Sequence, residues 1–167
     1  MTPDAFAVFY EQAFPEVYRY VFRAVLGNRA LAEDLTQETF VSVVAAVHDG
    51  RAEIHSMPWM IAVARHKLID HYRHAECEQR RLTSLWSSGS GRVDDDLDDL
   101  DVQDPDHAIE LLRNLLPAHR LVLVLRYLDD LSVNEIARSL GRSVRATESL
   151  LVRARRELAR NYREIDA

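Results

Sequence analysis

Apolar residues recur at intervals of three and four along most of the chain, which is the period of an amphipathic α-helix. Proline lacks the amide hydrogen that a helix interior needs. We therefore expect Pro15 to break or kink the first helical stretch into two helices, and Pro117 to divide a later one. The pattern predicts an all-α protein with helical stretches over 4–26, 30–48, 58–81, 108–128 and 131–160.

The periodicity stops between residues 84 and 106. A Ser-Gly-Ser-Gly run there is followed by eight aspartates, a composition that is typical of a flexible tether. We therefore predict two helical domains, with the boundaries 1–81 and 108–167, joined by an acidic linker over 82–107.

The stretch 131–160 has the local signals of two helices joined by a tight turn. Ser132 and Glu135 have the spacing of a capping box, and Gly141 is placed to end the first helix in a left-handed conformation. Ser143 is then positioned to cap the second helix. The expected inward positions are Ile136, Ala137 and Leu140 in the first helix and Leu151, Ala154 and Leu158 in the second.

This stretch is also basic, because residues 132–160 contain seven Arg and three Glu, a net charge of +4. The combination predicts a helix-turn-helix whose second helix enters a DNA major groove. The alternative is an ordinary helical hairpin with a solvated arginine face.

Charge is distributed unevenly along the chain, whose formal net charge is -6. The net charge is -2 over 1–81, -8 over 82–110 and +4 over 111–167. The acidity thus comes mostly from the linker. The overall charge argues against a protein that coats DNA nonspecifically, but a DNA-reading domain is still compatible with the basic C-terminal part.

Cysteine and histidine provide no cofactor chemistry. Cys77 is the one cysteine, so an internal disulfide is impossible, and the seven histidines lack the spacing of a zinc site. We expect no metal and no cofactor. No long apolar run or signal peptide is present in the sequence, so we expect a soluble, cytoplasmic protein without membrane insertion.

Two further stretches have an alternative functional interpretation. The acidic positions of 32–40 suit a solvated helix face by default. The helix from Pro58 alternates aromatic and cationic residues beside a loop at 49–57, which suits stacking on unpaired bases. A surface helix with Trp59 in the core explains the same pattern.

Together, the two ends of the chain resemble the bacterial sigma-70 factors, specifically the small extracytoplasmic-function (ECF) type. The N-terminal part resembles the sigma-2 domain, and the C-terminal part resembles the sigma-4 domain. The motifs that carry this resemblance are AEDLTQETF (32–40), PWMIAVARHKLIDHYRH (58–74), LPAHRLVLVLRYLDDLSVNEIARSLG (116–141) and RARREL (153–158).

The resemblance implies roles for the N-terminal motifs. The first motif is expected to dock on a coiled coil of core RNA polymerase, through Asp34, Leu35, Gln37, Glu38 and Phe40. The loop and the helix from Pro58 are expected to melt the minus-ten element and hold one strand, through His55, Ser56, Trp59, Arg65, His66, Lys67, Asp70 and Arg73. His66 stands where the family usually has Asn, so the base preference is expected to differ.

The helix-turn-helix is expected to read the minus-thirty-five element of the promoter. The implied residues are Arg142, Ser143, Arg145, Ala146, Thr147, Glu148, Leu150, Arg153, Arg155 and Arg156. Glu148 and Leu150 occupy two usually basic positions. A glutamate accepts from a cytosine amino group, and Leu or Ala touches a thymine methyl. A changed upstream preference is therefore expected.

The resulting hypothesis is a non-enzymatic sigma factor that joins core RNA polymerase, directs it to promoters and helps open the duplex. The resemblance also implies an anti-sigma factor as a regulator, and no obligate homo-oligomer is expected. The rival hypothesis is a stand-alone helix-turn-helix regulator of transcription, which has no need of the motif at 32–40. A nuclease that uses the aspartate run for metal is disfavoured, because a tether fixes no ligands.

Overall fold

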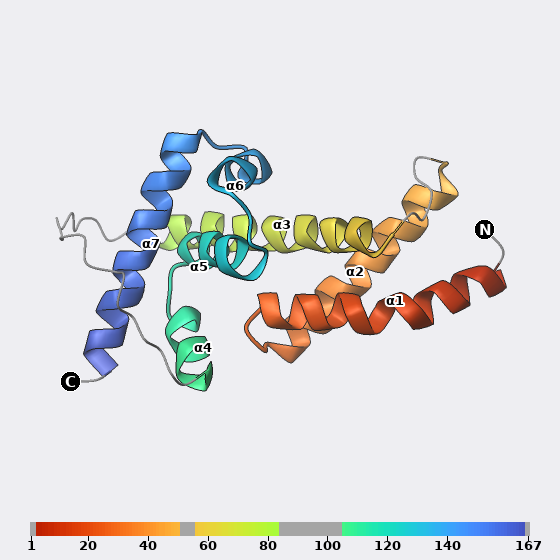
Figure 1. The fold of residues 1–167 in the computed structure, drawn as a ribbon, viewed down its shortest axis with the longest axis horizontal. Helices are drawn as coiled ribbons and strands as arrows, with labels where there is room; N and C mark the ends of the chain where they lie inside the picture. Colours follow the sequence, from red (N-terminus) through yellow and green to blue (C-terminus); the bar gives the residue numbers. More distant parts are fainter. Residues whose placement is uncertain (1–2, 51–55, 84–104, 166–167) are drawn as a thin grey trace. The chain divides into compact units, whose positions relative to one another are not determined.

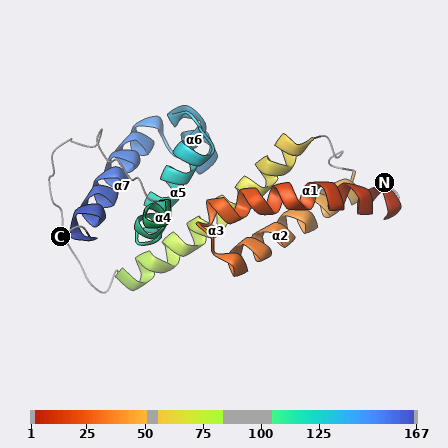
Figure 2. The same cartoon turned by 60° about the horizontal axis from the view of Figure 1, so that its bottom comes forward.

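Every element in the described part of the protein is a helix (Figures 1 and 2). The computed structural model describes residues 3–50, 56–83 and 105–165. The helices are α1 (Pro3–Ala24), α2 (Arg29–His48), α3 (Met57–Thr83), α4 (Pro105–Arg113), α5 (Pro117–Leu123), the π-helical turn η1 (Val124–Leu128), α6 (Val133–Leu140) and α7 (Val144–Ile165). The all-α prediction is confirmed. The eight aspartates of the predicted tether fall on 94–106, and all of those before Pro105 lie outside the described residues.

The chain forms two compact units, Met1–Asp70 and His71–Ala167. In the first unit, α1 packs along α2, and Val17 and Val21 of α1 are fully buried. Aromatic rings follow one side of α1, and the Tyr10 ring meets the edge of Phe40 from α2 with 4.7 Å between ring centroids. These contacts fix α2 against α1, so that the opposite face of α2 is held outward.

Pro15 does not divide the first helical stretch, because α1 runs unbroken from Pro3 to Ala24. The prediction of two helices was therefore wrong. Pro15 is exposed, so its ring lies on the solvent side of the helix. The buried contacts of Val17 and Val21 on the opposite side keep the helix continuous past the missing amide hydrogen. Pro117, in contrast, is the first residue of α5, where a missing amide hydrogen costs nothing.

The second unit contains the predicted helix-turn-helix. Residues 121–125 of α5 and η1 are all buried, and α7 packs against both α5 and α6. The capping box of α6 is present: the Ser132 side chain accepts from the Glu135 amide, and the Glu135 carboxylate accepts from the Ser132 amide at 2.8 Å. Gly141 ends α6 with φ +62, in the left-handed region that favours glycine. The local signals of the sequence therefore predicted both ends of α6.

Replacing Ser132 by Ala is expected to lower the free energy of unfolding by about 1 kcal/mol, because the Glu135 amide loses its acceptor. Urea denaturation followed by circular dichroism measures the change. Ser149→Ala is the matched control, since the Ser149 side chain is exposed on α7. Equal midpoints for the two variants would contradict a stabilising role for the cap.

Candidate polymerase surface and nucleic-acid interface

The predicted polymerase-binding residues divide into an exposed and a buried set. Asp34, Gln37 and Glu38 are exposed on α2. Leu35 and Phe40 are only 3% and 5% exposed, and they pack inside the first unit. In this structure these two apolar side chains hold α2 in place, while their polar neighbours face outward.

The first turns of α2 determine which carboxylates are available. Arg29 donates to Glu33 at 2.9 Å, and this hydrogen bond raises the pKa of the Arg29 guanidinium. Asp34 and Glu38 make no ion pair with any other residue in the described ranges. Two carboxylates on this face are thus free for an external cation.

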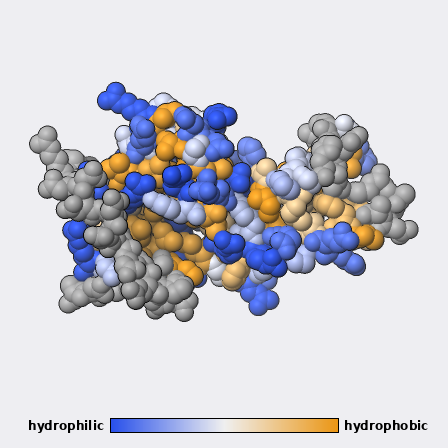
Figure 3. All heavy atoms as spheres, viewed as in Figure 1, coloured by the Kyte–Doolittle hydropathy of each residue, from blue (hydrophilic) through white to orange (hydrophobic). Residues whose placement is uncertain are grey.

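Two apolar side chains extend the same face, and the sequence motif did not indicate them. Val41 is 68% exposed and Val44 is 40% exposed on α2. Apolar patches also appear among hydrophilic side chains over the α1–α2 region in Figure 3. Gln37, Val41 and Val44 follow one another at helical spacing, so the polar end of the face continues into an apolar end. Their exposure depends on which face of α2 packs against α1, so the sequence alone had no signal for it.

The predicted minus-ten residues lie mostly on α3. Ser56, His66, Asp70 and Arg73 are exposed, while Trp59, Arg65 and Lys67 are half-buried. Trp59, His66 and Asp70 are seven and four residues apart, which places them on one side of α3. His55 lies outside the described residues.

Arg73 and Arg142 both make contacts within the second unit. The Arg73 Nη2 donates to the carbonyl oxygen of Ser139 in α6 at 3.3 Å. The Arg142 guanidinium pairs with the carboxylate of Glu76 at 3.3 Å, and Glu76 also binds Arg80 at 2.5 Å. Both predicted DNA-contacting arginines therefore have protein partners in this conformation.

The start of α7 is built around Ser143. Its hydroxyl accepts from the Ala146 amide at 3.1 Å, which confirms the predicted cap. Its carbonyl accepts from the Thr147 hydroxyl at 3.0 Å. Thr147 is fully buried and Leu150 is 4% exposed, so these two side chains pack against the rest of the unit. In this structure, neither side chain presents a surface to a base edge.

The outward side of α7 carries the remaining predicted minus-thirty-five residues. Arg145, Ala146, Glu148 and Arg153 are exposed. Arg155 lies over the Tyr127 ring at 5.8 Å and donates to its hydroxyl at 3.0 Å. Arg156 is half-buried, and its Nε has no hydrogen-bond partner among the described residues. Exposed arginines, together with the short side chain of Ala146 near the start of the helix, are suited to contact base edges in a DNA major groove.

Comparison with known proteins decides the family. A model of the family "Sigma-70 region 2" matches residues 9–77, and a model of "Sigma-70, region 4" matches residues 108–158. The chain belongs to the sigma-70 family. Its matched regions correspond to the two exposed surfaces described above.

Individual relatives place the sigma factor in the ECF group. It is 32% identical over 163 residues to the ECF sigma factor BldN of Streptomyces coelicolor, covering 94% of this chain and 60% of BldN. It is 31% identical to the sigma factor YlaC of Bacillus subtilis, covering 95% of this chain and 92% of YlaC. The predicted ECF identity is confirmed. Sigma factors are non-enzymatic subunits that direct RNA polymerase to promoters, as the sequence predicted.

A solved structure shares the fold. It is the sigma factor RpoE of Bartonella quintana in complex with the anti-sigma factor NepR, with a TM-score of 0.53 and 19% identity. The match covers 95% of this chain and 97% of that one.

Within the helices that the structure describes, none is long and apolar enough for a membrane span, and no cluster of three His, Cys, Asp or Glu residues is arranged for a metal.

Proposed function

We propose that this sigma factor binds core RNA polymerase through the outward face of α2 and reads promoter DNA through α3 and α7. The observation that carries the proposal is the presence of two separate exposed surfaces in the two matched family regions. One surface combines free carboxylates with apolar side chains, and the other is a capped helix-turn-helix with exposed arginines.

The polymerase contact is assigned to Asp34, Gln37, Glu38, Val41 and Val44. Exposed carboxylates suit a cationic partner helix and steer association. Exposed valines supply apolar area that a partner removes from water. The combination has the polar rim and apolar part of a protein interface.

Promoter opening is assigned to the exposed side of α3. Trp59 supplies an aromatic surface on which an unpaired base stacks, and His66 supplies ring nitrogens for a base edge. Stacking on an aromatic side chain offsets the few kcal/mol that unstacking a base costs. The minus-ten strand is therefore expected to run along Trp59, His66 and Lys67.

Upstream recognition is assigned to a narrower set than the sequence suggested. The side chains proposed to touch duplex DNA are Arg145, Ala146, Glu148 and Arg153, with Arg142 after it leaves Glu76. The net charge of +4 over 132–160 is modest for a lone DNA binder, so the polymerase is expected to supply most of the phosphate grip. We also propose an anti-sigma regulator that covers these surfaces, and a cytoplasmic location beside the polymerase.

The rival hypothesis of a stand-alone regulator is separated by one experiment. The protein is mixed with bacterial core RNA polymerase, and co-elution and promoter-dependent run-off transcription are measured. We expect co-elution and specific run-off products. Tight binding to duplex DNA alone, with no response to polymerase, would favour the regulator and exclude our proposal.

Replacing Glu148 by Lys is expected to raise affinity for nonspecific duplex DNA and to steepen its salt dependence by about one unit of slope. The reason is that a new cation on the outward side of α7 releases one more counterion from DNA. Binding of holoenzyme to a random duplex is measured between low and moderate salt. Glu164→Lys, at the far end of the same helix, is the matched control. An unchanged slope for Glu148→Lys would mean that residue 148 does not face DNA.

A further inference from the structure

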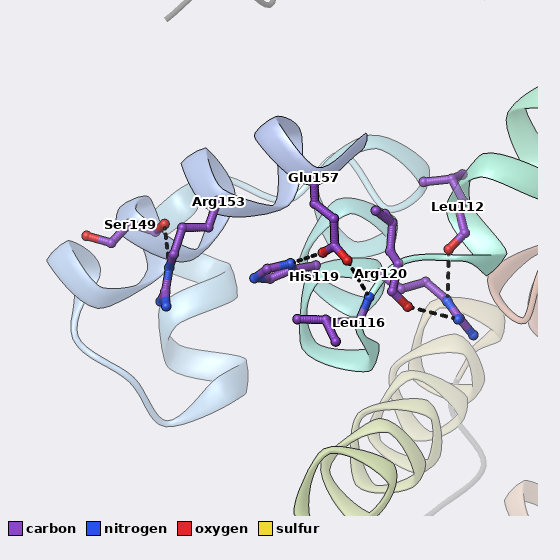
Figure 4. Close-up of polar contacts among 8 residues, drawn as sticks. Leu112, Leu116, His119, Arg120, Ser149, Arg153 and Glu157 are labelled. Carbon is purple, nitrogen blue, oxygen red and sulfur yellow. Dashed lines mark hydrogen bonds and ion pairs between the residues drawn. The ribbon is translucent and has the colours of Figure 1, made fainter. Parts of the chain in front are cut away.

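A carboxylate from α7 reaches the corner where α4 meets α5. Glu157 accepts a hydrogen bond from the backbone amide of Leu116 at 3.3 Å, and its second oxygen contacts the His119 ring nitrogen Nδ1 (Figure 4). The side chains of Glu157 and His119 are both only 12% exposed. A carboxylate that is this far from water needs both partners, because leaving either oxygen unpaired is costly.

The same corner is closed from its other side by Arg120. Its guanidinium donates to the carbonyl oxygen of Leu112 at 3.0 Å (Figure 4). It also donates to the carbonyl oxygens of Leu115, at 3.1 Å, and of Arg113. Leu112 and Arg113 lie in the last turn of α4, and Leu115 lies in the connection between α4 and α5. Arg120 therefore holds the end of α4 against α5 through backbone carbonyls, and Glu157 connects the start of α5 to α7.

The tie is directional, unlike the apolar contacts around it. Leu151 and Ala154 of α7 are buried, but the hydrophobic effect that holds them has no preferred direction. Glu157 holds two partners from the start of α5, so it opposes both rotation of α7 and sliding along its axis. Arg145 lies twelve residues earlier on α7, about 18 Å away along the helix axis. A small rotation at the corner is thus transmitted along a rigid helix to its DNA-reading end.

We propose that Glu157 is a positioning residue for upstream promoter recognition. Through the Leu116 amide and His119, it sets the rotation and register of α7 on α5. The side chains at the start of α7 then meet the minus-thirty-five base edges in one orientation. Glu157 itself touches no DNA in this role. The inference rests on the proposed function, because it assigns a task to the same helix-turn-helix.

The test uses holoenzyme reconstituted with full-length protein on two templates. One template has both promoter elements, and the other has a scrambled upstream element and a pre-melted downstream element. For Glu157→Ala, we expect at least about a tenfold loss of run-off product on the first template, which corresponds to the loss of one hydrogen bond to a charged group. Product on the second template is expected to stay within about twofold of wild type.

Two conservative variants distinguish positioning from charge and from stability. Glu157→Gln keeps the reach of the side chain and one oxygen acceptor, whereas Glu157→Asp keeps the charge and shortens the reach. We expect Gln to restore more upstream-dependent product than Asp. We also expect the alanine variant to lose its preference for one spacing between the two elements. Melting temperatures of all variants are recorded, and transcription is assayed well below them.

Three outcomes would overturn the inference. They are wild-type activity of Glu157→Ala on the first template, equal losses on both templates, and a better rescue by Asp than by Gln. A wild-type protein that fails on both templates would instead exclude the proposed function.

Discussion

Replacing Glu38 by Lys is expected to weaken binding to core RNA polymerase at least about tenfold, because it places a cation where the partner supplies cations. Glu38 is exposed and has no ion pair among the described residues, so its replacement leaves the fold unchanged. Competition between labelled wild type and the variant for limiting polymerase measures the effect. Run-off from a cognate promoter is expected to fall in parallel.

The matched control is Glu11→Lys on α1, which makes the same charge change at another exposed position of the first unit. It is expected to bind polymerase like wild type. Wild-type affinity of both variants would move the polymerase contact away from the outward face of α2. A shared loss would indicate a general effect of net charge.

Replacing Ile136 by Ala is expected to lower the free energy of unfolding by about 2–5 kcal/mol. Ile136 is fully buried in the helix-turn-helix, so the substitution leaves a cavity beneath the turn. Upstream-dependent transcription is expected to be lost, while polymerase binding through α2 is retained. Urea denaturation measures the first effect, and co-elution and run-off assays measure the other two.

Arg138→Ala is the control for this variant, because Arg138 is exposed on the same helix. Its free energy of unfolding is expected to change by less than about 0.5 kcal/mol. If Ile136→Ala kept full upstream dependence despite its lower stability, α6 would have no role in supporting α7.

Local signals predicted the helix-turn-helix well, since a cap, a left-handed glycine and a helical stripe each act within a few residues. Motif resemblance predicted the surfaces less evenly. It named Leu35 and Phe40 with their exposed neighbours, although a motif does not separate residues that bind from residues that support. Thr147 and Leu150 lie on the same stripe as Leu151 and Ala154, so extending that stripe toward the start of α7 would have placed them in the core.

Other features had no signal in the sequence. His119 and Glu157 are 38 residues apart, and only the packing of α5 on α7 brings them together. The continuity of α1 past Pro15 depends likewise on packing against α2. Exposure of Val41 and Val44 follows from which face of α2 meets α1, and this is decided by the assembled unit rather than by either helix alone.

The division of α7 into an inward and an outward side has a consequence for divergence among sigma factors. Thr147, Leu150 and Leu151 maintain the fold, while Arg145, Ala146, Glu148 and Ser149 face away from it. Substitutions on the outward side therefore carry little stability cost. Under the proposed function, a duplicated copy of this protein is free to acquire a new set of target genes by a few such substitutions, and each intermediate remains a folded subunit that competes for the same polymerase.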